Sequence, residues 1–565
     1  MERRAYHRVR EKIMLFIAIF AFGQILAQEK EIYWGNDVPE NWNGDWSDNL
    51  RTPSEKSGFT YTATNQDVLD YFAMLLESSE NVHVFNMFIS DLRRSSPVLV
   101  MSNPRITTSE EAKASGKMVV YLQGGIHPEE CEGKEALFMV IRDILFGDKK
   151  HLLDKLVILV NPNFNVDGNE TRVLTGGNPK LAGIRRNAAD YDVNRDAMKL
   201  QTLNMLGAYE NVFNTWDPTL IFDTHRMGNT RHGYAIGQST SNVVTAHQAP
   251  REYVTYKMFP SIVEKARKIG KIEVGMHCGL NEVWPPTEFT HDNSIWSTEA
   301  KFMASGYGLR NRMAILVETP GGETFEKAIY SQYIYTHALL EHCYEHSKEM
   351  QELCEKAEKE VVDTIKEKAA SGTLQNYVSG KYVSDGKISV YAYRDRNMRQ
   401  IPGTSMQELY RPNPPELIPN VDLITKPVGT KQSVVPRGYL IPEKLGFIVE
   451  KLKKHGVTVT QLQSDTEARG SEYLISSMEY KPMGFANYQM TTLSGAFTPS
   501  SKTFPAGTYV VDMAQPLANV VFYCLEPEVR DGFVGWNLLD EYLMDLGIND
   551  SSVVYPIFKY FNMEK

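Results

Sequence analysis

The sequence predicts an α/β protein in which a buried sheet presents polar residues along one edge. Several short apolar segments are followed directly by side chains that can bind a metal or transfer a proton. The segments are Met118–Leu122, Leu156–Val160, Leu220–Phe222 and Ala314–Val317. Open α/β sheets place their sites at the edge where the strands end. The repeated pattern therefore predicts both the fold class and the position of a functional site.

The first segment opens into Gln123-Gly-Gly-Ile-His127-Pro-Glu-Glu130, which offers an imidazole and a carboxylate three residues apart. Both groups are good zinc ligands, and a catalytic zinc takes three protein ligands and one open position for water. The His-x-x-Glu pattern alone is a weak signal, because roughly one copy is expected by chance in a chain of this composition. This copy follows a predicted strand and lies among glycines, so His127 and Glu130 are candidate zinc ligands.

A second cluster of the same residue types lies further along the chain. His342-x-x-Glu345-His346 overlaps with His346-x-x-Glu349 and matches the pattern of a different class of zinc site. It lies in the charged run Glu341–Lys368, which predicts a helix with a solvated face and contains no glycine. We favour surface charge for this cluster and keep a metal site there as the alternative.

Further polar residues follow the other segments in a fixed order. Leu156–Val160 opens into Asn161–Glu170, which is rich in turn-forming residues. The later polar stretches are Ile184-Arg185-Arg186-Asn187, Asp192-Val-Asn194-Arg195-Asp196, Asp223-Thr-His225 and Glu318-Thr-Pro-Gly. A lone histidine and a glutamate therefore join the first pair at the predicted edge of the sheet.

This ordered set resembles the zinc carboxypeptidase family, the carboxypeptidase A-like metallopeptidases, over about residues 50–346. Each element alone is unspecific, but His-x-x-Glu, Asn-Arg, a lone His and a Glu after a strand form the ordered signature of that family. The resemblance implies a carboxypeptidase-like α/β sandwich around a mixed central sheet. It also implies zinc as the cofactor, bound at one edge of that sheet.

Under this resemblance, His127, Glu130 and His225 match the three zinc ligands. Glu318 matches the general base that takes a proton from the zinc-bound water. Zinc lowers the pKa of a bound water from 15.7 to about 7, so a neighbouring carboxylate can accept its proton at neutral pH. Asp192 matches a carboxylate that orients the first ligand histidine.

The substrate-binding residues come from the same resemblance. Asn194 and Arg195 match the pair that holds the terminal carboxylate of the substrate, to which a guanidinium donates two parallel hydrogen bonds. Arg185 matches the arginine that stabilises the oxyanion, although the adjacent Arg186 leaves the register open. Tyr307 is the candidate for the tyrosine that closes over the substrate.

Each candidate has a purely structural alternative. His225 alone could be a buried core histidine, Arg195 could form a surface ion pair, and Tyr307 could be a packing residue. Arg226 departs from the family, in which a small or hydroxyl residue is common after the last histidine. It either forms an outward salt bridge or lines the substrate cleft. Cys131 is expected to face the core as a small apolar group.

The N-terminal sequence predicts that the protein is exported. Basic residues precede the apolar run Ile13–Phe22, and Ile25-Leu-Ala27 ends in a small residue before Gln28. This pattern predicts a signal peptide over residues 1–27 and a secreted or periplasmic protein. The run is short for a membrane span, which needs about 20 apolar residues. A retained signal anchor is the alternative, and a lipoprotein anchor is disfavoured because no cysteine follows Ala27.

Composition excludes several classes of protein. The chain has 565 residues and a net charge of −10, which supplies no basic surface for nucleic acid. Its five cysteines are scattered and odd in number, which argues against a disulfide framework. We expect a peptide or peptide-like substrate with a free C-terminal carboxylate and no stable membrane span in the mature form. The oligomeric state is left open.

The length predicts more than one structural unit. We expect a catalytic domain over residues 28–346, a helical linker over 347–372 that ends at Gly372, and an accessory domain over 373–565, either α+β or β-rich. Within the accessory domain, Leu445–His455 predicts a helix and Pro402–Pro436 an irregular stretch. The predicted strands are Lys387–Arg394, Val457–Leu462, Thr508–Asp512 and Val520–Tyr523.

Several C-terminal stretches resemble the extension of large bacterial zinc carboxypeptidase-like proteins. They are Gln515-Pro, Leu525-Glu-Pro-Glu-Val-Arg-Asp-Gly532 and Trp536-Asn. The role of this extension stays open between stability or docking on one side and shaping the cleft on the other.

Together these features predict a secreted or periplasmic zinc-dependent metallocarboxypeptidase. The enzymatic alternative is a zinc amidohydrolase that acts on a non-peptide amide or on peptidoglycan stem peptides. The alternative from another class is a binding protein on the same scaffold without activity. Glu318 and Arg195 argue against this last alternative, because both tend to be lost when only the scaffold is retained.

Overall fold

The computed structural model describes residues 31–564 except residues 176, 229, 292–297, 395–397, 401–406, 410–413, 483–488 and 549–552. The predicted signal peptide, residues 1–27, lies outside the described residues. Within the described part of the chain, every helix is too short or too polar to cross a bilayer.

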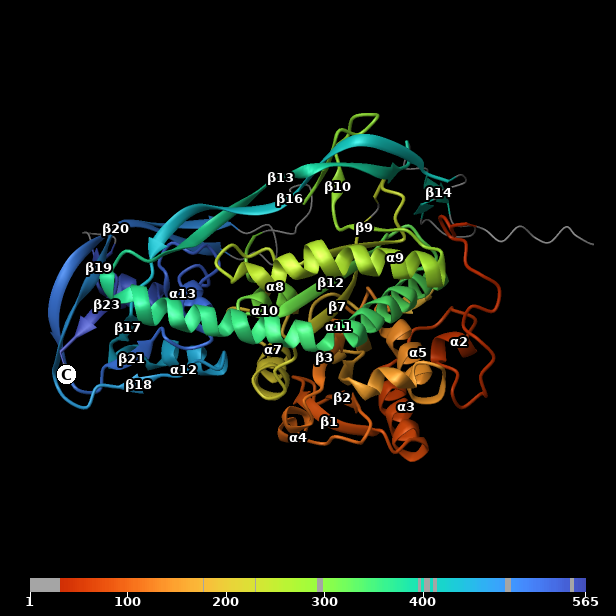
Figure 1. Ribbon diagram of the computed structural model, residues 1–565, viewed down its shortest axis with the longest axis horizontal. Helices are drawn as coiled ribbons and strands as arrows, with labels where there is room; N and C mark the ends of the chain where they lie inside the picture. The colour runs from red at the N-terminus through yellow and green to blue at the C-terminus, as the bar shows by residue number, and fades with distance from the viewer. Residues whose placement is uncertain are drawn as a thin grey trace, which may run out of the picture.

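An eight-stranded mixed sheet organises the first part of the chain (Figure 1). In spatial order its strands are β1 (Val82–Ile89), β2 (Ser95–Met101), β4 (Leu156–Asn161), β3 (Met118–Gln123), β7 (Leu220–Arg226), β12 (Met313–Thr319), β8 (Ile236–Thr240) and β9 (Val274–Met276). The central strands β4, β3, β7 and β12 run parallel to one another. Their carboxyl ends therefore meet at one edge, and the predicted α/β class is confirmed.

The central strands are continuous apolar runs because both faces of the sheet are covered. All residues of β3 and β4 are buried. Val120 and Leu122 pack with α3 (Asn65–Ser78), α5 (Glu132–Phe146), α9 (Phe259–Gly270) and α11 (Phe325–Lys368). Val119 and Tyr121 pack on the other face with α7 (Leu203–Ala208), η3 (Tyr209–Phe213) and α10 (Met303–Gly308). Alternate residues of one strand thus fill two separate cores.

Short elements connect these layers. They are α2 (Pro53–Lys56), α4 (Ser109–Ser115), η1 (Lys150–Asp154), α6 (Val166–Glu170), β5 (Val173–Leu174), β6 (Leu181–Ala182), η2 (Val193–Arg195), α8 (Gln248–Tyr253) and η4 (Val254–Met258).

Helix α11 joins the first part of the chain to the second (Figure 1). It has 44 residues and runs through the predicted boundary at residue 346, where His346 departs from helical geometry with φ −116° and ψ 15°. After η5 (Ala369–Ser371) the chain turns at Gly372, whose φ of 70° is left-handed. Glycine adopts this conformation at little cost, and the predicted helix end is confirmed.

A second sheet makes the C-terminal part β-rich, as predicted. Its strands are β18 (Thr460–Gln461), β21 (Tyr509–Asp512), β17 (Gly438–Ile441), β23 (Phe558–Met563), β19 (Thr466–Pro482) and β20 (Gln489–Phe504), with β22 (Val553–Val554) beside β19. Its helical elements are η6 (Glu443–Leu445), α12 (Gly446–Lys454), α13 (Ala518–Leu525) and α14 (Asp540–Asp545). Its core also contains Met198, Val243 and Leu309, so the two parts of the chain pack against each other.

Some predicted elements of this part are correct and others are wrong. The helix predicted over Leu445–His455 is α12, and the strand predicted over Thr508–Asp512 is β21. Val520–Tyr523 was predicted as a strand but lies in helix α13, all of which is buried. A short run of apolar residues alone does not show whether a buried segment is a strand or a helix. The strand predicted over Val457–Leu462 is reduced to β18.

The largest difference concerns Pro402–Pro436, which was predicted to be irregular. Within it, β16 (Glu416–Val434) is a strand of 19 residues that pairs with β13 (Gln375–Ala392), which contains most of the predicted strand Lys387–Arg394. Pro419 and Pro427 of β16 lie outside the residues Asp422–Ile424 that pair with β11 (Glu288–Thr290). A strand tolerates proline where it has a free edge.

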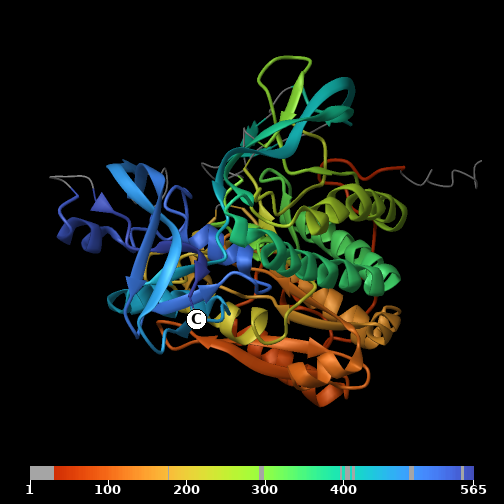
Figure 2. The ribbon, with the colours of Figure 1, turned by 60° about the vertical axis from the view of Figure 1, so that its left-hand side comes forward.

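The β13–β16 hairpin belongs to a four-stranded sheet with β10 (Gly279–Leu280) and β11. A smaller pair, β14 (Met398–Gln400) and β15 (Gln407–Leu409), lies near its tip. The hairpin extends from the C-terminal part over the first part of the chain, and Figure 2 shows it rising above both (Figures 1 and 2). Residues from beyond the predicted linker therefore pair directly with the segment between β9 and β12.

Candidate metal centre

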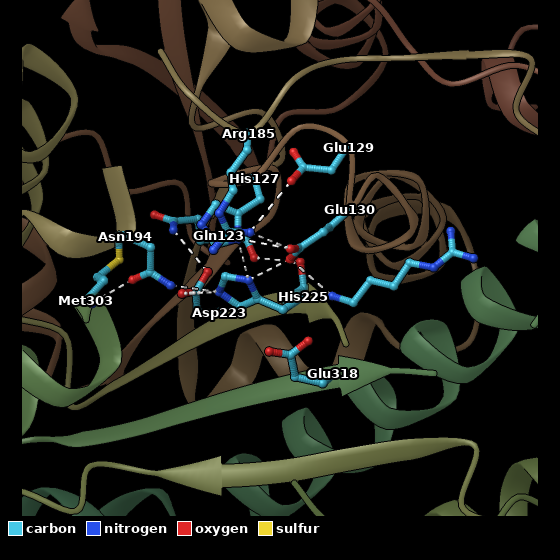
Figure 3. A network of polar contacts seen from close by, with 12 residues as sticks. Gln123, His127, Glu129, Glu130, Arg185, Asn194, Asp223, His225, Met303 and Glu318 are labelled. Carbon is cyan, nitrogen blue, oxygen red and sulfur yellow. Dashed lines mark hydrogen bonds and ion pairs between the residues drawn. The ribbon is translucent and has the colours of Figure 1, made fainter. Parts of the chain in front are cut away.

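His127, Glu130 and His225 converge at the carboxyl edge of the large sheet (Figure 3). One potential ligand atom from each lies within 4.8 Å of the others, and this is the only such group of three within the described residues. His225 is part of β7, whereas His127 and Glu130 lie between β3 and α5. The strand and the loop that the sequence placed at one edge thus supply all three side chains.

The two histidine rings point the same kind of nitrogen toward the glutamate. The Nδ1 atom of His127 lies 3.1 Å from Glu130 Oε1, and the Nδ1 atom of His225 lies 2.8 Å from Glu130 Oε2. The two Nδ1 atoms are 3.2 Å apart. Neutral imidazole nitrogen and carboxylate oxygen form a typical zinc donor set, so these residues fit a zinc ion with both histidines bound through Nδ1.

A carboxylate holds the opposite nitrogen of each ring. His127 Nε2 lies 3.0 Å from Asp192 Oδ1, which agrees with the role that the resemblance gave to Asp192. His225 Nε2 lies 2.9 Å from Asp223 Oδ2, and Gln123 donates a hydrogen bond of 3.1 Å to Asp223 Oδ1. Such contacts select the tautomer and orientation of a ligand ring.

The sequence prediction missed the role of Asp223. The signal was present, because residues two apart on a strand point to the same face and Asp223-Thr-His225 has that spacing.

The charges of the centre favour a bound cation. Burial disfavours a charged His225, but the Asp223 and Glu130 carboxylates outweigh burial and hold its pKa well above its usual value. Burial also opposes charge on His127, whose pKa is nevertheless raised by Glu130 and Asp192. The pKa of Glu130 is held well below its usual value by both histidines, against the effect of burial.

A close approach between α5 and β7 brings Glu130 to His225. A Cβ atom added to Gly133, in the first turn of α5, would lie 1.9 Å from Thr224 Oγ1. Only glycine lets the helix begin this near the strand. The backbone N–H of Arg226 donates a hydrogen bond of 3.1 Å to Glu130 Oε2, which fixes the carboxylate at the end of the strand.

Glu318 lies beside the centre because β12 is parallel to β7. The two strands pair in a register that sets Glu318 opposite His225. Burial raises the pKa of Glu318 to about 8, and the Glu130 carboxylate also raises it against the effect of His225. A bound dication would lower that pKa again. Its Oε2 atom is buried, and among the described residues no hydrogen-bond partner reaches it, although the side chain lies on the cavity lining.

These groups line one cavity of about 880 Å³. Its lining also contains His277, which sequence reasoning missed and whose Nε2 lies 3.9 Å from Glu318 Oε1. Burial and the nearby His225 lower the pKa of His277 to about 4. No pattern around His277 marked it, since it follows the short strand β9 without a recognisable spacing to the other residues.

The structure brings Arg185 rather than Arg186 to the centre. Arg185 Nη1 lies 3.0 Å from Glu130 Oε1, and its Nε lies 2.9 Å from Asp192 Oδ2. Arg186 instead pairs with the exposed Asp190 at 2.8 Å. The register that the sequence left open is therefore settled in favour of Arg185 as the arginine of the cavity.

Asn194 and Arg195 also line the cavity. Asn194 Nδ2 lies 3.3 Å from His225 Nε2, and its Oδ1 accepts a hydrogen bond of 2.9 Å from the backbone of Met303. The guanidinium of Arg195 lies over the Phe302 ring, 4.6 Å from its centroid, and donates to the carbonyl of Asn194. Arg195 is thus a buried cleft residue rather than a partner in a surface ion pair.

The prediction for Tyr307 is wrong. Its side chain is fully buried beneath the sheet, and its hydroxyl donates a hydrogen bond of 2.5 Å to the carbonyl of Pro218. The glycine-rich stretch around it forms helix α10 and not a loop that could close over a substrate. Tyr307 is absent from the described lining of the cavity.

Arg226 and Cys131 each follow a predicted zinc ligand directly in the sequence. Arg226 pairs with Glu132 and donates to the carbonyl of Gly321, and it also lines the cavity, so both predicted alternatives apply to it. Cys131 is buried in a small apolar cluster, as predicted. All five cysteines are free.

The second histidine cluster does not converge on a common point. His342 Nδ1 lies 2.9 Å from Ser261 Oγ, and His346 Nδ1 lies 3.2 Å from Glu349. Glu345 pairs with Lys265 at 2.6 Å. Each group has its own partner. Glu345 is exposed and His346 half-buried, as the charged pattern predicted, but His342 is buried.

Comparison with known families supports this geometry. Residues 74–243 match the family described as zinc carboxypeptidase, and this range contains His127, Glu130 and His225. The chain carries a zinc carboxypeptidase domain. The metal of this domain is zinc, and the domain is a metallocarboxypeptidase, a class of hydrolase. Glu318 lies beyond the matched range, so its place beside the zinc site comes from the structure.

The zinc carboxypeptidase domain and the C-terminal part are both included in alignments with curated proteins. Carboxypeptidase 2 of Trichophyton rubrum is 23% identical over 521 residues, which cover 88% of this chain and 86% of that protein. The probable carboxypeptidase 2 of Arthroderma benhamiae is 23% identical over 507 residues, with 85% and 86% coverage. Among solved structures, a metallo-carboxypeptidase from Burkholderia cenocepacia is 16% identical, with a TM-score of 0.35 over 48% of this chain and 68% of that chain.

Proposed function

We propose that this protein is a secreted or periplasmic carboxypeptidase that removes residues from the C-termini of peptides. His127, Glu130 and His225 hold the zinc. When bound, zinc polarises the scissile carbonyl and lowers the pKa of a coordinated water. The observation that carries the proposal is the strand register, which sets Glu318 opposite His225 on the cavity lining, with one buried carboxylate oxygen that has no hydrogen-bond partner among the described residues.

In this proposal Glu318 moves the proton. Its carboxylate, whose Oε2 has no hydrogen-bond partner among the described residues, accepts a proton from the attacking water and then gives it to the leaving amine. Its burial among the strand ends keeps bulk water from competing for that oxygen.

Arg185 stabilises the negative charge that develops on the carbonyl oxygen. Its guanidinium lies against Glu130 and Asp192 and remains about one third exposed, with a side-chain exposure of 37%. It therefore has N–H groups available beside the metal ligands. A preorganised cationic donor at this place stabilises the tetrahedral oxyanion more than the planar substrate.

Arg195 and Asn194 hold the terminal carboxylate of the substrate. A buried guanidinium stacked on Phe302 presents a rigid edge to the cavity, which suits two parallel hydrogen bonds to a carboxylate. This contact directs cleavage to the C-terminus, because only the last residue of a peptide carries a free α-carboxylate.

The test compares one good peptide substrate as free acid and as C-terminal amide. We expect amidation to lower kcat/KM by about tenfold to a hundredfold, because a charge-assisted contact is lost. Arg195→Ala should weaken hydrolysis of the free acid and leave the amide unaffected. Equal cleavage of both forms, at internal bonds, would replace the proposal with an amidohydrolase or endopeptidase on the same zinc site.

Secretion is a separate part of the proposal. It is supported by the basic and apolar N-terminus that ends at Ala27. Expression of the full chain with a C-terminal tag, followed by N-terminal sequencing, should give a mature protein that begins at Gln28. A protein that keeps Met1 and sediments with membranes would instead show a retained signal anchor.

A further inference from the structure

One wall of the cavity contains a buried arginine that the proposed mechanism does not use. Arg231 follows β7, lines the cavity and is 8% exposed. Its Nη2 atom donates to the backbone carbonyl of Asn281 at the start of the β10–β11 turn. Its Nε atom has no hydrogen-bond partner among the described residues.

Two other buried arginines of this protein pair with carboxylates. Arg142 pairs with Glu55 at 2.7 Å, and Arg312 pairs with Asp217 and Glu358. Arg310 has no carboxylate partner of this kind, and its Nε also has no hydrogen-bond partner among the described residues, but its other nitrogens donate to two carbonyls and to Asn214 away from the cavity.

Arg231 forms no ion pair with any described carboxylate. Only its Nη2 atom donates hydrogen bonds within the described residues, and the acceptors are backbone carbonyls. A buried charge without a counterion destabilises the fold. Such a group is expected where a ligand supplies the missing negative charge.

The backbone of Arg231 is held rigidly by the β13 end of the long hairpin. Tyr393 N–H donates a hydrogen bond of 2.7 Å to the carbonyl of Arg231, and Gly233 N–H donates one of 2.8 Å to the carbonyl of Tyr391. A Cβ atom on Gly233 would lie 2.5 Å from Pro415, so the hairpin lies directly against this stretch. A fixed backbone keeps the guanidinium in place before the substrate arrives.

We propose that Arg231 binds an acidic side chain of the substrate, in one of the two residues that flank the bond to be cut. The inference rests on the proposed carboxypeptidase function, in which Arg195 takes the terminal carboxylate. Arg195 contacts Phe302 and Asn194, whereas Arg231 contacts the β10–β11 turn, so the cleft presents guanidinium groups on two separate walls.

A peptide with an acidic residue beside the scissile bond carries two carboxylates and matches both cations. Glu282 and Glu288 also line the cavity, but both are exposed, and solvent screens their repulsion.

The test uses pairs of peptides that differ only in Glu or Gln, placed either at the last residue or at the one before it. We expect kcat/KM for Glu to exceed that for Gln about tenfold or more at one of these places, as for a hydrogen-bonded charge pair. In Arg231→Gln this ratio should fall to near one, while hydrolysis of the Gln peptides continues. Arg231→Lys keeps the charge without the planar fork and should retain a reduced preference.

Arg312→Gln is the matched control, because Arg312 is also 8% exposed but lies outside the cavity lining. It is expected to lower stability and to leave the Glu-to-Gln ratio unchanged.

A ratio near one at both places in the wild type, or a ratio that survives in Arg231→Gln, would overturn the inference while C-terminal trimming of neutral peptides still upheld the proposed function. If no peptide were hydrolysed, calorimetric binding of the same pairs to Glu318→Gln would decide the role of Arg231 separately.

Discussion

Two stretches of this chain contain histidine and glutamate at the same local spacing, yet only one of them forms a metal centre. His127 and Glu130 follow a buried strand, and a second histidine reaches them from β7, far away in the sequence. His342, Glu345 and His346 lie on one long helix and each pairs with a separate neighbour. Convergence from separate segments of the chain, and not local spacing, distinguishes the metal site from the cluster on the helix.

The contrast extends to the groups around each cluster. In the first, a carboxylate contacts the outer nitrogen of both rings, so each ring can present Nδ1 to a metal. In the second, the His342 ring lies between Ser261 and Tyr253, which are neutral. Carboxylates therefore contact both rings of the first cluster, but in the second they contact His346 and not His342.

The largest expected effect is the loss of zinc from His225→Ala. Removal of one of three ligands should leave the purified protein with almost no bound metal, as measured by mass spectrometry of the metal content. His342→Ala is the control and should retain zinc at the wild-type level. Full zinc in the first variant and none in the second would move the site to His342, Glu345 and His346.

Glu318→Gln is expected to lower kcat by the order of 10²-fold or more. The amide is nearly isosteric but cannot accept the proton of the attacking water. Zinc content and peptide binding should stay near the wild-type level, which separates loss of the base from loss of the metal. Turnover close to that of the wild type would show that another group, such as the neighbouring His277, takes the proton.

Asp223→Asn tests whether the outer carboxylates distinguish the two clusters. Loss of such a partner is expected to weaken zinc binding about 10-fold to 100-fold. The measurement is the zinc dissociation constant from competition with a chromogenic chelator. Asp143→Asn is a suitable control, because Asp143 also contacts a histidine, His337, but lies away from the cavity. Unchanged zinc affinity in Asp223→Asn would mean that strand geometry alone orients His225.

The sequence predicted the site better than it predicted the rest of the chain, and the reason is physical. His225 and Glu318 terminate apolar strands, and parallel strands bring such residues together whatever the loops do. Asp223 was missed although its spacing to His225 placed it on the same face of β7. Tyr307 was misplaced because its position depends on how α10 packs under the sheet, which local sequence does not determine.

Long-range pairing explains the errors in the C-terminal part. The β13–β16 hairpin has polar residues along both strands and proline in β16, and it is a strand pair because each strand has the other as a partner. Arg231 escaped notice for the same reason. Nothing beside it in the sequence marks it as a cleft residue, and its position is held by Tyr391 and Tyr393, which are far away in the chain. The C-terminal part therefore contacts the backbone of a stretch that lines the cleft.

The smallest expected effect concerns the pH dependence of the second cluster. Burial lowers the pKa of His342 to about 4, and the charge of the adjacent His346 adds to this effect, so the folded protein keeps the ring neutral where the unfolded chain binds a proton. Stability attributable to His342 is thus fully present above its ordinary pKa of 6.5 and declines as the pH falls from there toward 4. Between pH 7 and pH 5 this loss should be about 1 to 2 kcal/mol. His342→Gln removes the ring. The free energy of unfolding is measured with urea at pH 7 and pH 5 for both proteins. Its decrease between these pH values should be smaller in the variant than in the wild type by the same amount. An equal fall in both proteins would show that His342 is charged in the folded state, and would make the second cluster more like the first.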